Sequence, residues 1–154
     1  MNSKDVKRVL FVGLGEAILE YSYPAITKLE EEGLVKIVGC ADINNFDGTL
    51  ANLNSRYERY PKEKKSIDRI KKKINDNQFF HHQTSVDSFG ENPKVVLDKA
   101  DIIYIATPNN VRVGFVKESV DAGKGVIIEK PVAHTRGGVG NLFSLCNGAK
   151  VICA

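Results

Sequence analysis

The segment VIIEKPVAH, residues 126–134, places a glutamate and a lysine directly after a run of β-branched residues. Such a run is typical of a buried strand, and Pro131 ends a strand because proline has no backbone N–H to donate. Glu129 and Lys130 are therefore predicted to lie where a core strand stops. A carboxylate and an ammonium fixed there can bind a ligand or transfer a proton. Taken alone, Lys130 is better described as a surface lysine that follows a strand.

A glycine-rich turn in the segment VGLGEAI is the second candidate. Gly13 and Gly15 follow an apolar run and precede a helical pattern, which is the context in which a G-x-G turn lets backbone N–H groups approach a dinucleotide pyrophosphate. We therefore expect Gly13, Gly15 and the adjoining Glu16 to contact a dinucleotide. The third glycine of the full motif is replaced by Ile18, so the turn by itself is a weak signal.

An acidic residue after the next apolar run strengthens that signal. Asp42 ends the segment VKIVGCAD and lies 27 residues after Gly15. A carboxylate at this position accepts hydrogen bonds from both ribose hydroxyls of adenosine and repels a 2′-phosphate. The sequence thus predicts NAD as the cofactor, with NADP the weaker candidate. The alternative is a turn aspartate beside an ordinary glycine turn.

The segment IATPNNV, residues 105–111, ends a further apolar run with polar residues. Thr107, Pro108 and Asn109 are predicted at the carboxyl edge of the sheet, where ligands bind in open α/β folds. We expect these three residues to contact the cofactor. Taken alone, the segment is described equally well as a turn in which Asn109 or Asn110 caps the next helix.

The elements that must hold these residues follow an alternating order of apolar runs and helical patterns. Several runs are continuously apolar, as in strands that are covered on both faces. Strand–helix alternation predicts an α/β protein of the Rossmann type, with a doubly wound, mainly parallel sheet of about six strands. The predicted strands cover residues 8–13, 35–42, 78–82, 101–108, 125–130 and 150–154.

Two helical regions are less regular. Pro24 interrupts the helical pattern that follows the glycine turn, so this helix either begins near Ser22 or bends there. Residues 44–60 are polar and rich in turn formers and are predicted to be irregular, whereas residues 61–76 form an amphipathic helix.

The amphipathic helix carries most of the positive charge. The net charge of the chain is +3, but residues 62–73 alone carry +5, so the remainder carries −2. A solvated lysine face is the simpler interpretation, and a patch for nucleic acid or phosphorylated substrates is the alternative. With few interleaved aromatic residues and no nucleic-acid motif, the sequence favours the first.

Composition sets further bounds. A chain of 154 residues with 42% hydrophobic residues fits one compact domain. No apolar run reaches the roughly 18 residues of a transmembrane helix, and the N-terminal segment has no cleavage site of a signal peptide. Cys40, Cys146 and Cys153 form no C-x-x-C pair. The pattern favours free thiols in the cytoplasm over disulfides or a metal site.

Taken together, four motifs resemble the N-terminal domain of the glucose–fructose oxidoreductase/inositol dehydrogenase/MocA family. The motifs GLG, CAD, YIATPNN and AGKGVIIEKPVA occur in order, and the resemblance covers residues 6–154. It implies an oxidoreductase that moves hydride between a sugar or polyol hydroxyl and a nicotinamide cofactor. It also implies that Lys130 lies beside the nicotinamide and moves the hydroxyl proton. Glu129 and Pro131 position this lysine, and the proline is often cis in the family.

The sequence departs from the family pattern at several places. Arg112 stands where a histidine is common, and HTRGGVGNLF carries three glycines where the family has a regular helix. The loop from Ile18 to Pro24 is longer than usual. Parts of these segments also look like the cofactor domain of glucose-6-phosphate dehydrogenases, but those enzymes usually have an arginine near the position of Asp42 for NADP.

Family members continue into a second domain that forms the substrate pocket and supplies further catalytic residues. The chain ends within its last predicted strand, so we expect residues 1–154 to be the cofactor domain of an enzyme, without the substrate domain. Lys130 then lacks a catalytic partner, since His134 only follows the turn, and we expect NAD binding without turnover. The alternative is a stand-alone module that senses NAD or pairs with another chain. The resemblance is compatible with a homo-oligomer, but the sequence does not fix the oligomeric state, because the second domain normally supplies the subunit interface.

Overall fold

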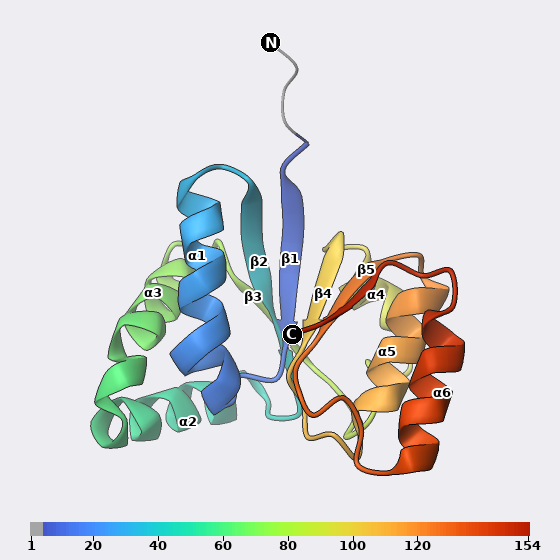
Figure 1. Cartoon of the computed structure of the whole chain (residues 1–154). Coiled ribbons are helices and arrows are strands. Elements are labelled where there is room, and N and C mark those ends of the chain that lie inside the picture. Colours follow the sequence, from blue (N-terminus) through green and yellow to red (C-terminus); the bar gives the residue numbers. More distant parts are fainter. Residues whose placement is uncertain (1–4) are drawn as a thin grey trace.

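The computed structural model describes residues 5–154, which form a six-stranded sheet flanked by helices on both sides (Figure 1). All strand pairs are parallel, and the strand order is β3-β2-β1-β4-β5-β6. The Rossmann-type fold class predicted from the sequence is confirmed. The strands are β1 (Lys7–Val12), β2 (Val35–Asp42), β3 (Phe80–Gln83), β4 (Ile102–Ile105), β5 (Gly125–Ile128) and β6 (Val151–Cys153).

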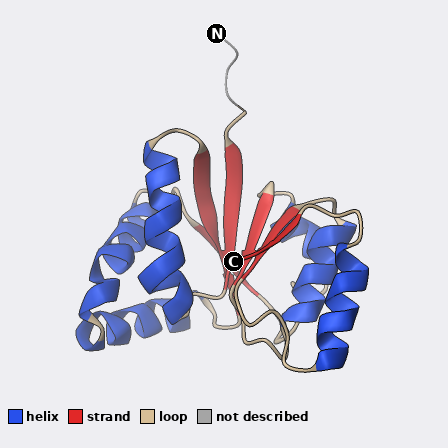
Figure 2. Ribbon diagram, in the orientation of Figure 1, coloured by secondary structure: helices blue, strands red, loops and turns tan. Residues whose placement is uncertain are grey.

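The helices form two layers, one on each face of the sheet (Figure 2). One layer holds α1 (Tyr23–Glu31), α2 (Phe46–Arg59) and α3 (Lys64–Asn75), and the other holds α4 (Pro93–Leu97), α5 (Arg112–Asp121) and α6 (Arg136–Cys146). Each layer packs its own apolar cluster against the strands. Phe11 belongs to the cluster under α1 to α3, and Leu10, the next residue along β1, to the cluster under α4 to α6. Opposite faces of one strand thus carry both cores.

The α-helix after the glycine turn begins next to Ser22, and a segment of a different helix type precedes it. A π-helical segment, η1 (Ala17–Ser22), leads directly into α1, and Pro24 lies in the first turn of α1. Tyr23 donates its backbone N–H to Ile18 O, five residues earlier. Because proline has no N–H, the first turn of a helix tolerates it. The helix type therefore changes next to the proline. The prediction that the regular helix begins near Ser22 is confirmed, because Ser22 is the N-cap residue of α1 and Tyr23 its first residue.

The prediction that residues 44–60 are irregular is wrong, because α2 occupies most of this segment. Asn45 caps the helix, its side-chain oxygen accepting the backbone N–H of Gly48 at 2.8 Å. Thr49 and Leu53 are buried at helical spacing. The cap and this burial outweigh the polar composition.

The basic helix predicted after it is present as α3, preceded by the short 3₁₀ helix η2 (Pro61–Glu63). Ile67 and Ile70 are fully buried. Several basic residues of the charged segment have partners: Lys62, Arg69 and Lys73 lie 3.0, 3.0 and 2.6 Å from Glu20, Glu31 and Glu30, respectively. This pairing with the helical layer supports the interpretation as a structural, solvated face.

Residues 136–146 form the regular helix α6 in spite of three glycines, so the expected departure from a helix in this segment is wrong. Thr135 caps the helix by accepting the N–H of Gly138 at 3.0 Å, and Leu142 is buried against the sheet. Among the described residues, no helix combines the length and apolar character that crossing a membrane requires.

Candidate functional site

The predicted site residues follow four strands that are neighbours in the sheet. Gly13 comes directly after β1, Asp42 ends β2, Thr107 lies just after β4 and Glu129 follows β5. Because these strands are parallel and adjacent in the order β2-β1-β4-β5, their carboxyl ends meet at one edge (Figure 1). A single edge of the sheet therefore gathers motifs that span residues 13–131.

A groove of about 370 Å³ runs along this edge. Five of the predicted cofactor contacts line it, and five do not. The lining residues include Gly13, Gly15, Asp42, Thr107 and Pro108. Glu16, Asn109, Glu129, Lys130 and Pro131 lie outside it. Glu16 is exposed at the start of the π-helical segment.

The two glycines of the turn differ in whether the local structure requires a glycine. Gly13 has φ +83°, a conformation that favours glycine, and its N–H donates to Ala41 O at 2.8 Å. Gly15 has no such φ, and a Cβ atom built on it would meet no atom within 4 Å. Neither backbone strain nor packing requires a glycine at this second position. The open space beside Gly15 therefore leaves its backbone accessible to a ligand.

Asp42 joins the end of β2 to the glycine turn. One carboxylate oxygen accepts the backbone N–H of Leu14 at 3.0 Å. The other accepts the backbone N–H and the side-chain amide of Asn44, at 3.1 and 2.9 Å. Asp42 is half-buried and lines the groove. Its carboxylate thus orders the turn while staying in contact with the groove.

Thr107 forms part of the opposite wall of the groove. Its hydroxyl oxygen is buried and has no hydrogen-bond partner among the described residues, although buried polar groups are nearly always hydrogen-bonded. Its carbonyl oxygen, in contrast, accepts two hydrogen bonds from Arg112. The wall therefore holds one satisfied and one unsatisfied polar group.

Arg112, the first residue of α5, connects this wall to the turn that follows β5. Its side chain is 4% exposed. Nε lies 3.1 Å from Thr107 O, to which Nη2 also donates, and Nη1 donates to Glu129 O and to Pro131 O, the latter at 2.6 Å. Burial lowers the pKa of Arg112, while the Glu129 charge acts in the opposite direction. At the position where the family commonly has a histidine, this chain therefore has a buried guanidinium.

The Glu129 side chain belongs to a second cluster, on the other side of the same turn. One of its carboxylate oxygens accepts the hydroxyls of Ser22 and Tyr104, both at 2.7 Å. The two hydroxyl oxygens are 2.9 Å apart. Burial, together with the bond to Glu129, raises the pKa of Tyr104 to about 12, against the effect of Ser22. Glu129 is thereby fixed to the end of the π-helical segment.

Lys130 is exposed on this turn, and the Lys130–Pro131 peptide bond is cis. The cis form that the family resemblance implies is confirmed. His134 is exposed as well. His81 is half-buried far from the turn, on β3; its Nε2 lies 3.1 Å from the Thr49 hydroxyl, and burial lowers its pKa. Among these, only Lys130 adjoins the Glu129 cluster.

Three residues of the site were not found by reading the sequence: Ser22, Tyr104 and Arg112 in these structural roles. Tyr104 and Ser22 are separated from Glu129 by 25 and 107 residues. No spacing rule links such positions, because their proximity depends on the strand order and on the π-helical segment. For Arg112, the only signal was its place shortly after Thr107.

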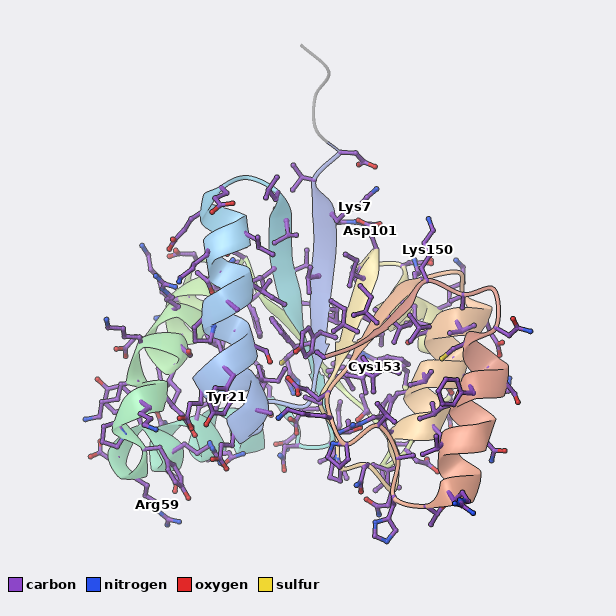
Figure 3. All side chains as sticks on the ribbon, viewed as in Figure 1. Lys7, Tyr21, Arg59, Asp101, Lys150 and Cys153 are labelled. Atoms are coloured by element: carbon purple, nitrogen blue, oxygen red, sulfur yellow. The ribbon has the colours of Figure 1, made fainter. Side chains whose placement is uncertain are left out.

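A larger hollow of about 550 Å³ lies at the opposite end of the sheet. Lys7, Asp101 and Lys150 line it, and all three lie near the beginning of β1 (Figure 3). None of the predicted catalytic or cofactor-binding residues lines it. The chemistry-bearing residues therefore gather at the carboxyl edge.

Comparison with protein families gives a match over nearly the whole chain. The model of the Gfo/Idh/MocA family, described as an oxidoreductase family with an NAD-binding Rossmann fold, matches residues 7–154. No curated protein sequence matches the chain.

Solved structures show the same fold at low sequence identity. An oxidoreductase from Thermotoga maritima aligns with a TM-score of 0.64 and 15% identity, over 96% of this chain and 37% of its own. A dehydrogenase from Clostridium difficile gives 0.61 and 17%, over 96% and 39%. A 3-ketoreductase from Actinomadura kijaniata, solved with TDP-benzene and NADP, gives 0.59 and 18%, over 97% and 37%. The chain thus spans less than two fifths of the length of these proteins.

Proposed function

Because the chain belongs to the Gfo/Idh/MocA oxidoreductase family, whose domain here is an NAD(P)-binding Rossmann fold, we propose that it serves a dehydrogenase that prefers NAD. The reaction is hydride transfer between a hydroxyl of a sugar or polyol and the cofactor. The observation that carries the proposal is the groove at the carboxyl edge, which Gly13, Gly15, Asp42 and Thr107 line beside the Lys130 turn.

The residues of the groove fit a dinucleotide in two respects. The open space at Gly15 leaves room for a pyrophosphate against the backbone of the turn. The buried Thr107 hydroxyl has no hydrogen-bond partner within the part of the chain that the structure describes, and a bound polar group can supply one. We therefore assign the pyrophosphate to Gly13 and Gly15, with Glu16 at the start of the same helix. The nicotinamide end is assigned to Thr107, Pro108 and Asn109.

The preference for NAD rests on charge. Asp42 lines the groove with a carboxylate that accepts hydrogen bonds from ribose hydroxyls, after exchange of the exposed Asn44 for the ligand. Among residues 5–154, which the structure describes, no lysine or arginine lines the groove. A 2′-phosphate would therefore meet a negative charge without a compensating cation.

Lys130 is proposed as the catalytic residue. When bound, the nicotinamide ring supplies the acceptor or donor of the hydride. The ammonium or amine of Lys130 moves the proton of the substrate hydroxyl, which is the task of a general acid–base. Glu129 and Pro131 are proposed as its positioning neighbours, and their carbonyls on either side of this lysine accept hydrogen bonds from Arg112. The substrate pocket is proposed to require a further domain, since the structural neighbours are more than twice as long as the chain.

Direct titration with NADH and NADPH tests the cofactor assignment. We expect NADH to bind more tightly, and Asp42→Ser combined with Ile43→Arg to reverse the order. Asp42→Asn is the matched control: it keeps a side-chain oxygen for the Leu14 N–H but removes the charge, so it should narrow the preference without reversing it. Tighter binding of NADPH by the native chain would refute the role of Asp42.

Turnover is tested separately with NAD and a panel of glucose, glucose 6-phosphate and inositol. We expect the chain alone to bind NAD without producing NADH, because the substrate must also be positioned, and positioning can lower a barrier by about 7–11 kcal/mol. Steady NADH formation that Lys130→Met abolishes would show that residues 1–154 suffice for catalysis, against the proposed need for another domain.

A further inference from the structure

The buried guanidinium of Arg112 is an unfavourable choice if packing were its only purpose. A charge that is 4% exposed has lost most of its hydration, and Arg112 opens α5, where the helix dipole disfavours a cation. No carboxylate accepts a hydrogen bond from it among the described residues. An apolar side chain of similar length would fill the same volume at a lower cost in desolvation.

Beside the favourable charge of Glu129, all hydrogen bonds that the guanidinium donates go to backbone carbonyls of two separate loops. Thr107 O belongs to the loop after β4, and Glu129 O and Pro131 O belong to the turn after β5. The last two carbonyls flank Lys130 on either side and share one nitrogen of the guanidinium. The planar, fixed fork of arginine suits such an arrangement, because its donors point in set directions.

The same guanidinium therefore touches both functional parts of the edge. Thr107 lines the groove assigned to the cofactor, and the flanked Lys130 is the residue assigned to proton transfer. Arg112 itself does not line the groove. It acts through the backbone of other residues and cannot contact the cofactor from its buried position.

We propose that Arg112 is the positioning residue of the site: by binding the carbonyls of Thr107, Glu129 and Pro131, it couples the cofactor groove to the Lys130 turn. The inference rests on the proposed function, since Lys130 must lie next to the bound cofactor. Without the guanidinium, the loop after β4 and the turn after β5 can move independently. The cofactor then still binds, but its position relative to Lys130 is no longer fixed.

The first arm of the test needs no ligand. Hydrogen exchange is followed in peptides that cover residues 105–111 and 127–134, for the native chain, Arg112→Met and Arg8→Met. Arg8 is the matched control, because its guanidinium also bonds to three acceptor atoms, on Asp98 and Asp101 at the opposite edge of the sheet. We expect exchange in both peptides to be at least about tenfold faster in Arg112→Met only.

The second arm measures acylation of Lys130 by an amine-reactive ester, with and without saturating NADH, by peptide mass spectrometry. We expect NADH to slow labelling of Lys130 in the native chain and in Arg8→Met. In Arg112→Met, we expect this protection to be lost, although NADH affinity falls by no more than about threefold, which is under 1 kcal/mol. A purely structural arginine would lower affinity and protection together or leave both unchanged.

Each outcome decides a different claim. Exchange in Arg112→Met that equals exchange in Arg8→Met, or protection of Lys130 that survives in Arg112→Met, overturns the inference. NADH binding to the native chain without protection of Lys130 overturns it as well. Failure of the native chain to bind NADH refutes the proposed function instead, and the exchange arm still decides whether Arg112 couples the loops. If Arg112→Met does not fold, Arg112→Lys replaces it, because lysine keeps the charge but lacks the fork; the same changes, smaller in size, are expected.

Discussion

The two halves of the carboxyl edge are organised by opposite charges. On the β1–β2 side, the carboxylate of Asp42 gathers N–H donors from Leu14 and Asn44. On the β4–β5 side, the guanidinium of Arg112 gathers carbonyl acceptors, with Thr107 among them. Each charge thus fixes a loop by binding backbone groups of the complementary type.

The halves differ in the exposure of the organising charge. Asp42 is half-buried and lines the groove, whereas Arg112 is buried and does not. A reachable charge can exchange a protein partner for a ligand hydroxyl, and an unreachable one can only hold the chain in place. The comparison teaches that the same kind of contact serves recognition in one half and positioning in the other.

The largest effect that we expect is on stability: substitution of Arg112 should destabilise the fold more than substitution of Asp42. Arg112→Met leaves three carbonyl groups without their buried donor, so the free energy of unfolding should fall by about 2–3 kcal/mol. Asp42→Asn should cost less than about 1 kcal/mol, because the amide oxygen still accepts a hydrogen bond and water reaches the site. Denaturant unfolding of both variants measures the difference. Equal losses would show that the two halves are not built on different principles.

The strands and the residues of the β1–β2 side could be predicted from the sequence, because short segments of chain carry the patterns that mark them. The six strands were predicted from apolar runs, several of them continuous, and Gly13, Gly15 and Asp42 from their places relative to the first two strands. These patterns are reliable because short segments of chain determine a strand, the turn after it and the residue that ends the next strand. The NAD(P)-binding family assigned from these motifs is confirmed by the match over residues 7–154.

The other half depends on contacts that no local pattern encodes. The bonds from Arg112 to Glu129 and from Ser22 to Glu129 exist only after β4 and β5 pair and η1 packs beside them. Composition was misleading for α2 and α6, where capping by Asn45 and Thr135 and burial of a leucine outweigh polar or glycine-rich sequence. Tertiary packing decided these cases against local propensity.

The second-largest effect that we expect concerns ligand recognition on the β1–β2 side of the edge. Gly15→Val should lower NAD affinity by at least about tenfold, or roughly 1.4 kcal/mol, because the new side chain occupies the open space beside the turn. Folding should be kept, since a Cβ atom there meets no atom within 4 Å and the glycine has no positive φ. Calorimetric titration with NAD and thermal unfolding measure the two quantities.

Gly140→Val is the control for this substitution. Gly140 also has open space around its Cβ position and no positive φ, but it lies on α6, away from the groove. We expect its NAD affinity to match that of the native chain. Unchanged affinity in Gly15→Val would place the cofactor elsewhere and refute the claim that the β1–β2 side recognises it.

The smallest effect that we expect concerns the pair of Arg8 and Asp101 at the opposite edge of the sheet. This pair is more exposed and serves as a reference for Asp42 and Arg112. Arg8 donates to both carboxylate oxygens of Asp101 and, through that side-chain bond, lowers the pKa of Asp101 from 3.8 to about 2, while partial burial opposes the shift. A folded-state pKa below the unfolded value stabilises the fold above the unfolded pKa. This contribution is lost as the pH falls from about 4 to about 2. Solvent reaches both side chains, so we expect this contribution to the free energy of unfolding to be roughly 1 kcal/mol at neutral pH.

Asp101→Asn should therefore be less stable than the native chain at pH 7, and the free energies of unfolding of the two chains should converge near about pH 2. A difference that stays constant over this range would mean that shape and hydrogen bonding, rather than charge, hold this edge together. Exposure would then be a poor guide to how Asp42 and Arg112 differ.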